Sequence, residues 1–263
     1  MTGKRSDLPK RAVAGIVMIT VALGALWLGG IVFWLLAVVG ALVMMAEWGG
    51  LHRASARDTR LAQFALSVPL AVMAPASLTI VPDDFFSLGL IGGAAFFVVI
   101  VTRRPQFAIG VVYCALPVLA LMLIRRQHEG IVFTLWALAL VWACDIGAYF
   151  AGRAIGGPKL APTISPNKTW AGLIGGVAAA SVFAALMHWR FGLPWRMTLA
   201  TPALAVLAQM GDLYESWLKR RVGVKDSGTS IPGHGGVMDR LDGLVPVAPV
   251  AAFLVVLPHF YLS

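Results

Sequence analysis

Long apolar runs make up most of this chain, and short stretches rich in charged and turn residues separate them. A helix needs about 20 residues to cross a hydrocarbon core of about 30 Å, with roughly 17 to 25 acceptable. Division of the sequence at charges and turn residues predicts nine such helices, approximately at residues 12–29, 31–47, 61–81, 85–102, 106–124, 131–150, 170–188, 197–214 and 244–262. The pattern therefore predicts an all-α polytopic membrane protein, a bundle of about nine transmembrane helices, in which residues 1–263 form a single integral membrane domain.

The distribution of Lys and Arg predicts how these helices are oriented. If the N-terminus is cytoplasmic, the loops on the opposite side hold only four of the 21 Lys and Arg residues, namely Arg125, Arg126, Arg190 and Arg196. Because cytoplasmic loops are enriched in positive charge, the count favours a cytoplasmic N-terminus and a C-terminus on the opposite side. We expect a protein of a bacterial-type inner (plasma) membrane whose active site faces the cytoplasm.

The overall composition excludes an ordinary soluble domain, because 59% of the residues are hydrophobic and only 13% are charged. The formal net charge of +9 could indicate a nucleic-acid partner. The basic residues, however, occur in small clusters beside apolar runs, where they serve as orientation signals and contacts for anionic headgroups. We therefore predict the lipid bilayer as a partner and no nucleic acid.

Residues 211–243 are the most polar stretch of the chain. At about 2.5 to 3.5 kcal/mol per charged residue at a bilayer centre, burying its ten charges in lipid would cost on the order of 30 kcal/mol, so we expect the stretch to face water. Four of its residues offer the hard oxygen ligands that magnesium prefers: Asp212, Asp226, Asp239 and Asp242. Five offer cationic donors for phosphate oxygens: Lys219, Arg220, Arg221, Lys225 and Arg240. Glycines at 233, 235 and 236 let backbone N–H groups approach an anion.

This composition favours phosphoryl or nucleotidyl transfer, but a solvated connector between membrane helices would also fit it. The order of the residues is more specific. The stretch reads Ser-Trp-Leu-Lys-Arg at 216–220, Lys-Asp-Ser-Gly at 225–228 and Ile-Pro-Gly-His-Gly-Gly-Val-Met-Asp-Arg-Leu-Asp at 231–242. It closely resembles the signature of the phosphatidate cytidylyltransferases, also called CDP-diacylglycerol synthases, without a departure across the 27 residues 216–242.

A second polar segment surrounds Asp145, which lies inside the predicted helix 131–150. An ionisable group there is costly and is a functional candidate by default, although a structural ion pair with a nearby Lys or Arg is the alternative. The following loop carries Leu-Ala-Pro at 160–162 and Ser-Pro-Asn-Lys-Thr at 165–169, just before a predicted helix start, a place suited to anions. These residues also resemble the family.

Two positions in this segment depart from the family pattern. Gly157 stands where a lysine is usual, and Ala171 stands where a glutamate is usual. The nearby small residues Gly172, Gly175 and Gly176 indicate close helix packing more than a phosphate cradle.

The resemblance implies a nucleotidyltransferase of phospholipid biosynthesis that transfers CMP from CTP to phosphatidic acid, giving CDP-diacylglycerol and pyrophosphate by metal-assisted in-line displacement. Its catalytic segments would be approximately residues 142–172 and 209–243. The residues expected to be catalytic are Asp212, Lys219, Arg220, Lys225, Asp226, His234, Asp239 and Arg240. Those expected to bind substrate are Lys159, Ser165, Lys168, Ser216, Gly235 and Gly236.

One or two Mg²⁺ ions are the expected cofactor. Asp212 and Asp239 are the leading ligands, and Asp145 and Asp242 are ligands or supporting residues of second rank. A further monovalent cation and a homodimer are left open. His234 is either a structural donor of a phosphate-binding loop or an acid near the leaving group.

Two other functions remain as alternatives. A CTP-dependent lipid kinase of the polyprenol type would share the nucleotide-binding groups but release CDP. A transporter of a phosphorylated solute would be expected to spread its charges through the middle of its helices, whereas here they concentrate in loops. We interpret Glu47 and His52, at the end of a predicted helix, as solvated interfacial residues.

Overall fold

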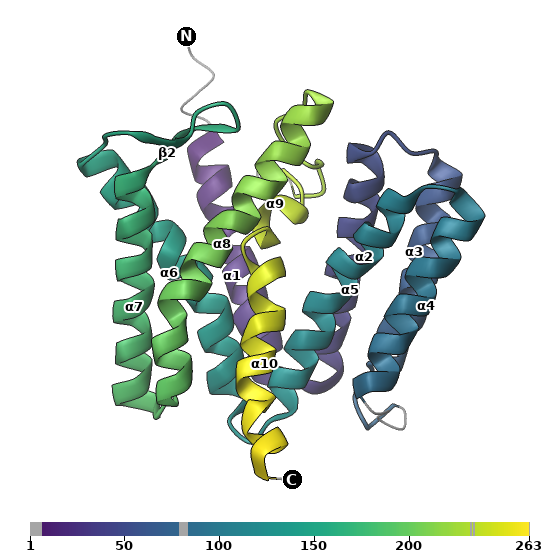
Figure 1. Ribbon diagram of the computed structural model, residues 1–263, viewed down its shortest axis with the longest axis horizontal. Helices are drawn as coiled ribbons and strands as arrows, with labels where there is room; N and C mark the ends of the chain where they lie inside the picture. The colour runs from purple at the N-terminus through teal and green to yellow at the C-terminus, as the bar shows by residue number, and fades with distance from the viewer. Residues whose placement is uncertain (1–6, 79–83, 232, 234, 263) are drawn as a thin grey trace. The chain divides into compact units, whose positions relative to one another are not determined.

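The computed structural model describes residues 7–78, 84–231, 233 and 235–262, and these residues are mostly helical (Figure 1). The chain divides into two compact units. Unit 1 comprises the chain up to Val118 together with residues 224–240, and unit 2 comprises residues 119–223 and the chain from Leu241 onward. Helix α5 and the short helix α9 each contribute to both units.

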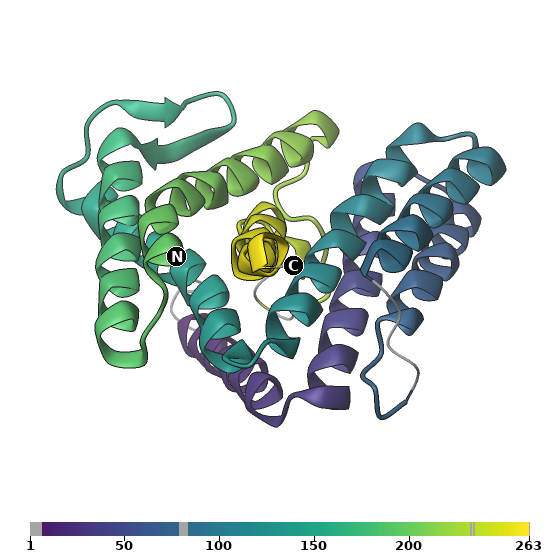
Figure 2. The same cartoon turned by 60° about the horizontal axis from the view of Figure 1, so that its bottom comes forward.

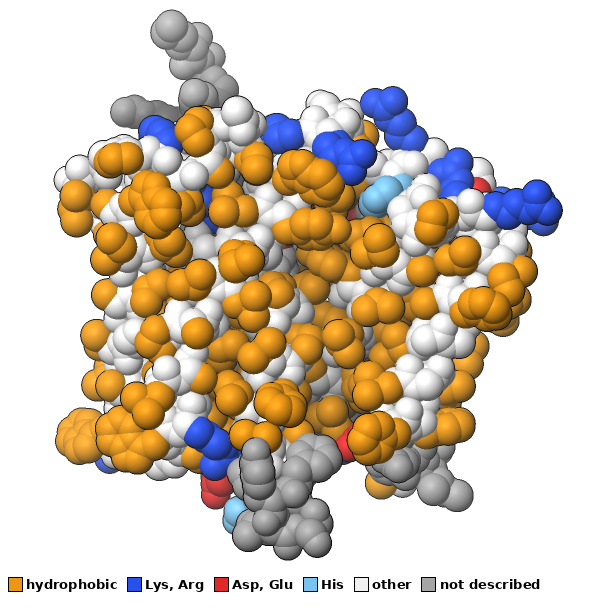
Figure 3. Space-filling model, viewed as in Figure 1, with side chains coloured by type: hydrophobic (Ala, Val, Ile, Leu, Met, Phe, Trp, Pro, Cys, Tyr) orange, Lys and Arg blue, Asp and Glu red, His pale blue; other side chains and the backbone are white. Residues whose placement is uncertain are grey.

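Within the described residues, a helix overlaps each of the nine predicted positions. The long helices are α1 (Asp7–Leu28), α2 (Gly30–Leu51), α3 (Ala56–Val72), α4 (Asp84–Thr102), α5 (Pro105–Arg126), α6 (Gly130–Ala154), α7 (Trp170–Phe191), α8 (Trp195–Val222) and α10 (Leu244–Leu262). Five of them, α2, α4, α5, α6 and α7, are long and apolar enough to cross a membrane, and shorter apolar helical segments run from Gly15 to Leu28 and from Leu244 to Leu257. Hydrophobic side chains cover much of the surface that faces the viewer in Figure 3, and the Lys and Arg side chains visible there lie toward its upper and lower edges.

Several helix boundaries differ from the sequence prediction, above all those of α8 and α3. Helix α8 continues past the predicted end at 214 to Val222, because the charged residues there are compatible with a helix and its first strong stop is Gly223, which adopts φ 80°. Helix α3 begins before the predicted start, where the Ser55 side chain accepts a hydrogen bond from the Asp58 N–H at 3.0 Å. It ends at Val72, and residues 79–81 of the predicted helix lie outside the described residues.

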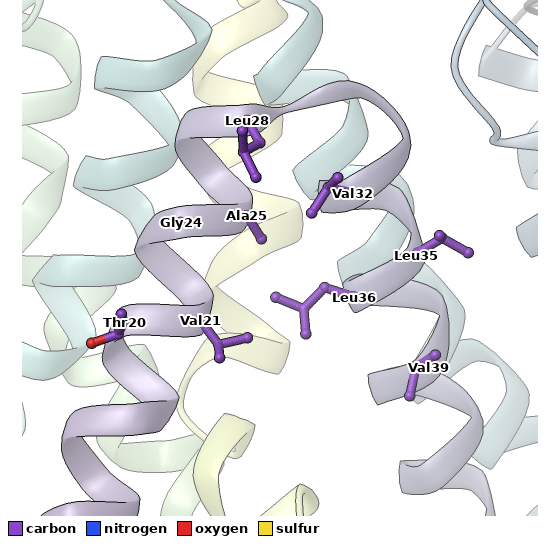
Figure 4. A pocket seen from close by; sticks show the side chains of 9 residues that line it. All are labelled: Thr20, Val21, Gly24, Ala25, Leu28, Val32, Leu35, Leu36 and Val39. Carbon is purple, nitrogen blue, oxygen red and sulfur yellow. The ribbon is translucent and has the colours of Figure 1, made fainter.

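In unit 1, α2 packs against α1 and α3, and α3 packs against α4. The Trp48 indole N–H donates to the Gln106 carbonyl at 2.9 Å, which ties α2 to α5. Between α1 and α2 lies an open apolar groove of about 520 Å³. Its lining includes Val21, Leu28 and Leu36, which Figure 4 shows facing the space between the two helices. Such a surface suits contact with lipid chains.

In unit 2, α6 and α7 pack closely because small residues face each other. A Cβ atom at Gly175 would collide with Ala151, and one at Gly176 would lie 2.7 Å from the Cys144 carbonyl oxygen. These contacts confirm the packing role predicted for the glycines of α7. Strands β1 (Lys159–Ala161) and β2 (Ser165–Thr169) form an antiparallel hairpin beside the start of α7 (Figure 2).

Candidate active site

In unit 2, a cluster of polar side chains from α6, β2 and α8 gathers around Lys168. The Lys168 ammonium lies 2.6 Å from Asp212 Oδ2 and donates to Gln209 Oε1 at 2.9 Å. Gln209 in turn donates to Asp145 Oδ1 at 3.1 Å, and the Ser216 hydroxyl donates to Asp212 Oδ1 at 3.3 Å. We call these residues, together with Asp242, the aspartate–lysine cluster.

Asp242 adds a third carboxylate to this cluster. Asp242 follows α9 (Met238–Leu241) and precedes α10, and its Oδ1 accepts the Gly243 N–H at 2.7 Å. Burial and then the nearby carboxylate of Asp212 raise the pKa of Asp242 to about 7, and Asp145 adds to the rise, whereas the Gly243 N–H and Lys168 oppose it. Three carboxylates thus share one electrostatic environment with the ammonium of Lys168.

This donor set fits magnesium. It offers hard carboxylate oxygens, and a divalent cation would offset the repulsion that Asp212 and Asp145 exert on Asp242. In the part of the chain that the structure describes, no three His, Cys, Asp or Glu side chains form a ready-made metal cage. Magnesium does not need one, because it usually binds one or two protein carboxylates and completes its coordination with water and substrate phosphate.

The end of α8 lies next to the hairpin. Arg220 donates from Nε to the Ile164 carbonyl oxygen at 3.3 Å, in the turn between β1 and β2. Lys159 is exposed on β1 and Ser165 is partly buried on β2. The hairpin therefore places three of the predicted substrate-binding residues, Lys159, Ser165 and Lys168, on one small element of unit 2.

Lys219 departs from the expectation that the whole polar stretch faces water. Its ammonium lies 3.3 Å from Glu215 Oε1, one helical turn earlier on α8, and both residues are buried. The expectation is wrong for this pair because two opposite charges four residues apart on a helix offset much of each other's desolvation.

In unit 1, the loop of residues 225–238, here called the signature loop, wraps around the side chain of Glu47 on α2. Glu47 Oε1 accepts the Val237 N–H at 2.9 Å and the Ser230 hydroxyl at 2.7 Å. Glu47 Oε2 accepts the Met238 N–H at 2.8 Å and the Ser227 hydroxyl at 3.1 Å. Only 6% of Glu47 is exposed.

A second carboxylate, Asp239, also binds this loop. Its Oδ2 accepts the N–H groups of Ser227 at 2.9 Å and Gly236 at 2.8 Å, and it lies 3.0 Å from the Ser227 hydroxyl. Gly235 has φ 83°, and a Cβ atom there would lie 2.8 Å from Asp239 Oδ2. The glycines thus do let backbone N–H groups approach an anion, but in this structure the anions are the protein's own carboxylates. We call Glu47, Asp239 and their partners the signature-loop cluster.

The remaining predicted residues of the loop region are exposed: Lys225, Asp226 and Arg240. They are accessible to an anionic or metal-bound ligand. His234 lies outside the described residues.

Comparison with known proteins now identifies the family. The model of the cytidylyltransferase family matches residues 9–257, which is nearly the whole chain. The chain belongs to the cytidylyltransferase family. A phosphatidate cytidylyltransferase of Brucella suis is 39% identical over 251 residues, covering 92% of this chain and 91% of the relative. Those of Bacillus subtilis and Staphylococcus epidermidis are 44% and 42% identical over 134 and 135 residues, about half of each chain. The family resemblance drawn from the signature is confirmed.

Some residues of this cytidylyltransferase's clusters were not among the predicted site residues, and Glu47 and Gln209 are the two with the most partners within them. The interpretation of Glu47 as a solvated interfacial residue is wrong, because its carboxylate is buried and accepts four hydrogen bonds. The available signal was that Glu47 is the only ionisable side chain in the 22 residues of α2. Gln209 was also missed, since a neutral amide in an apolar run gives no charge signal.

Proposed function

We propose that the protein is a phosphatidate cytidylyltransferase, which transfers CMP from CTP to phosphatidic acid and releases pyrophosphate. The observation that carries the proposal is the family match over residues 9–257, with a relative of that name aligned over 92% of the chain. The aspartate–lysine cluster supports it, because nucleotidyl transfer needs acidic metal ligands beside cationic phosphate donors.

Within unit 2, Asp212 would hold Mg²⁺, with Asp242 or Asp145 as a second ligand or a supporting residue, and Asp239 remains a predicted ligand in unit 1. When bound, the metal neutralises triphosphate charge and so makes the α-phosphorus more open to attack. Lys168 neutralises Asp212 in its present position, where its ammonium is also available to a phosphate oxygen. Ser216 orients the Asp212 carboxylate through the hydrogen bond to Oδ1.

We propose a direct displacement. An oxygen of the lipid phosphate forms a bond to the α-phosphorus of CTP, and the bond from that phosphorus to the oxygen bridging to the β-phosphate breaks, so pyrophosphate leaves with its electron pair. The lipid phosphate is already an anion at neutral pH, so no general base is required. The exposed Arg220, Lys225 and Arg240 are the proposed cationic groups for charge on the phosphates, whereas Lys219 is buried and paired with Glu215.

The charge count supports an orientation with the N-terminus in the cytoplasm and the C-terminus outside it, with the nine long helices as the membrane-embedded part. In this arrangement residues 151–169 and 211–243 face the cytoplasm of a bacterial-type inner membrane, where CTP is available. The phosphatidic acid substrate would come from the bilayer itself.

The test uses purified full-length protein with CTP labelled at the α-phosphate and phosphatidic acid in mixed micelles. We expect the label in a lipid product, with an equal amount of pyrophosphate. Label that appears only in free CDP, with a phosphorylated lipid alcohol formed from a polyprenol, would contradict the proposal and favour the lipid kinase. Label that stays in unreacted CTP with both lipids would contradict both enzymes.

A further inference from the structure

Glu47 holds the signature loop at both of its ends. Ser227 and Ser230 lie near the start of the loop and Val237 and Met238 lie at its end, and all four donate to the same carboxylate. These partners are 180 to 191 residues away from Glu47 in the chain. One side chain on α2 therefore joins the two ends of a loop that is distant from it in the sequence.

The loop is shaped to fit this carboxylate. A Cβ atom at Gly228 would lie 2.9 Å from Glu47 Cγ and Oε1, and one at Gly236 would lie 2.6 Å from Glu47 Oε2. Neither glycine could carry a side chain while Glu47 keeps its place. Two glycines of the signature thus have a specific cause in this structure, which is the close approach of the loop backbone to Glu47.

The charge of Glu47 is as important as its shape. A buried carboxylate is tolerated when hydrogen-bond donors surround it, and here each oxygen accepts one backbone N–H and one serine hydroxyl. A hydroxyl can turn and become an acceptor, but a backbone N–H can only donate. A glutamine at this position would therefore place its NH₂ group against the N–H of either Val237 or Met238, whichever way its amide is turned.

We propose that Glu47 is a positioning residue for the cytidylyltransferase reaction: it fixes the signature loop so that Asp239, which follows Met238 in the chain, is presented in one conformation. This inference rests on the proposed function for the reaction that it serves, but its structural part stands on contacts within unit 1 alone. Asp239 also binds the same loop, through the N–H groups of Ser227 and Gly236. Loss of Glu47 would leave Asp239 to hold the loop by itself.

The test compares Glu47→Gln, Glu47→Asp and Ser230→Ala with a matched control, Asp58→Asn. Asp58 is a carboxylate in the same unit that lies 3.6 Å from Arg104 and takes no part in the loop. Full-length proteins are purified, and four quantities are measured: kcat, KM for CTP, the melting temperature, and hydrogen exchange of peptides covering residues 225–240.

We expect Glu47→Gln to lower kcat about 10- to 100-fold, the usual effect of losing a group that orients a ligand carboxylate. KM for CTP should change much less, and the melting temperature should stay close to that of the control. Exchange at Val237 and Met238 should become faster in Glu47→Gln, while peptides from α4 and α7 stay protected. Glu47→Asp should recover part of the loss, because it keeps the charge but is one methylene too short to reach both ends.

Ser230→Ala removes one of the four hydrogen-bond donors to Glu47, and its position is exposed. This variant therefore still tests the proposal if Glu47→Gln does not fold. It should give a smaller loss of kcat with a measurable increase of exchange at Val237. The double variant should be no slower than Glu47→Gln alone, because both changes act on one contact. Wild-type kcat and wild-type loop exchange in either single variant would overturn the proposal. If the wild type made no CDP-diacylglycerol, the proposed function would fail instead, and loop exchange would still decide the role of Glu47.

Discussion

The two polar clusters use the same side-chain chemistry in opposite ways. In the signature-loop cluster, N–H and O–H donors of the loop satisfy the carboxylates of Glu47 and Asp239. In the aspartate–lysine cluster, burial and the carboxylates of Asp212 and Asp145 raise the pKa of Asp242 to about 7, and Lys168 only partly opposes them. A carboxylate with several fixed donors organises structure, whereas carboxylates that repel one another are the groups that the proposed function assigns to Mg²⁺. The contrast therefore separates the cluster that holds a loop from the cluster that is proposed to hold a metal.

The sharpest test of that contrast is Asp212→Asn, for which we expect the largest effect. The change keeps the shape of the side chain but removes its charge, so turnover should fall about 100- to 1,000-fold while the protein stays folded. In this variant the Lys168 ammonium keeps a hydrogen-bond acceptor in its partly buried site, because Gln209 Oε1 still accepts from it. Activity and melting temperature are measured beside Asp58→Asn. In the wild type, a chelator should abolish turnover and Mg²⁺ should restore it. Equal activity of the two variants would remove Asp212 from the site.

Asp239→Asn tests whether Asp239 belongs with the metal-binding carboxylates as well as with the loop. An asparagine can turn its side-chain oxygen toward the N–H groups of Ser227 and Gly236, which now donate to Asp239 Oδ2. The loop should therefore keep its protection from hydrogen exchange. If Asp239 is a magnesium ligand, turnover is nevertheless lost, and we expect a loss nearly as large as in Asp212→Asn. Retained turnover with a protected loop would assign Asp239 to the scaffold alone.

Asp242 provides a smaller effect that depends on pH. Its folded-state pKa of about 7 lies above the value of an unfolded aspartate, so between about pH 4 and pH 7 the folded protein binds more protons than the unfolded one. Stability from this group is therefore greatest at low pH and is lost as the pH rises toward 7. In chelator, the melting temperature of Asp242→Asn should decline less than that of the wild type across this range. Parallel curves would show that Asp242 is not electrostatically crowded.

The smallest effect on activity is expected from cysteines that report which membrane side each segment faces. Thr229 and Arg190 are exposed and suit the purpose better than the neighbouring glycines, because Gly228 packs against Glu47 and Gly192 has φ 68°. In a background without Cys114 and Cys144, Thr229→Cys and Arg190→Cys should keep near wild-type turnover. They should react with an impermeant reagent from opposite sides of the membrane. If both cysteines reacted from the same side of the membrane, the proposed orientation would be wrong.

Much of this architecture could be predicted from local composition. Apolar length is a property of a short window, so helices were found at each predicted position in the described chain. Their ends were less predictable: the division at the first charges stopped α8 at 214, but the backbone continues to Gly223, where a left-handed residue can end it. The first charged residues after an apolar run indicate where contact with lipid ends, but the helix itself can continue beyond them, as α8 does.

The signature and the Asp145 segment also allowed most of the aspartate–lysine cluster to be named in advance. Asp145, Lys168, Asp212, Ser216 and Asp242 were predicted site residues, and the fold of unit 2 brings them into one electrostatic environment. Gln209 could not be recognised, because its importance comes from two partners 41 and 64 residues away. An amide has no charge to attract notice until the groups on either side of it are known.

Glu47 marks the limit of local reasoning most clearly. At the end of an apolar helix, a carboxylate that faces the headgroups and one that is buried under a loop have the same sequence surroundings, and only the donors available to it distinguish them. Those donors come from residues 227–238, and they reach Glu47 only because the chain returns to unit 1 after crossing unit 2. Hydropathy and motif spacing are properties of neighbouring residues, whereas the burial of a charge depends on which distant groups the fold brings to it.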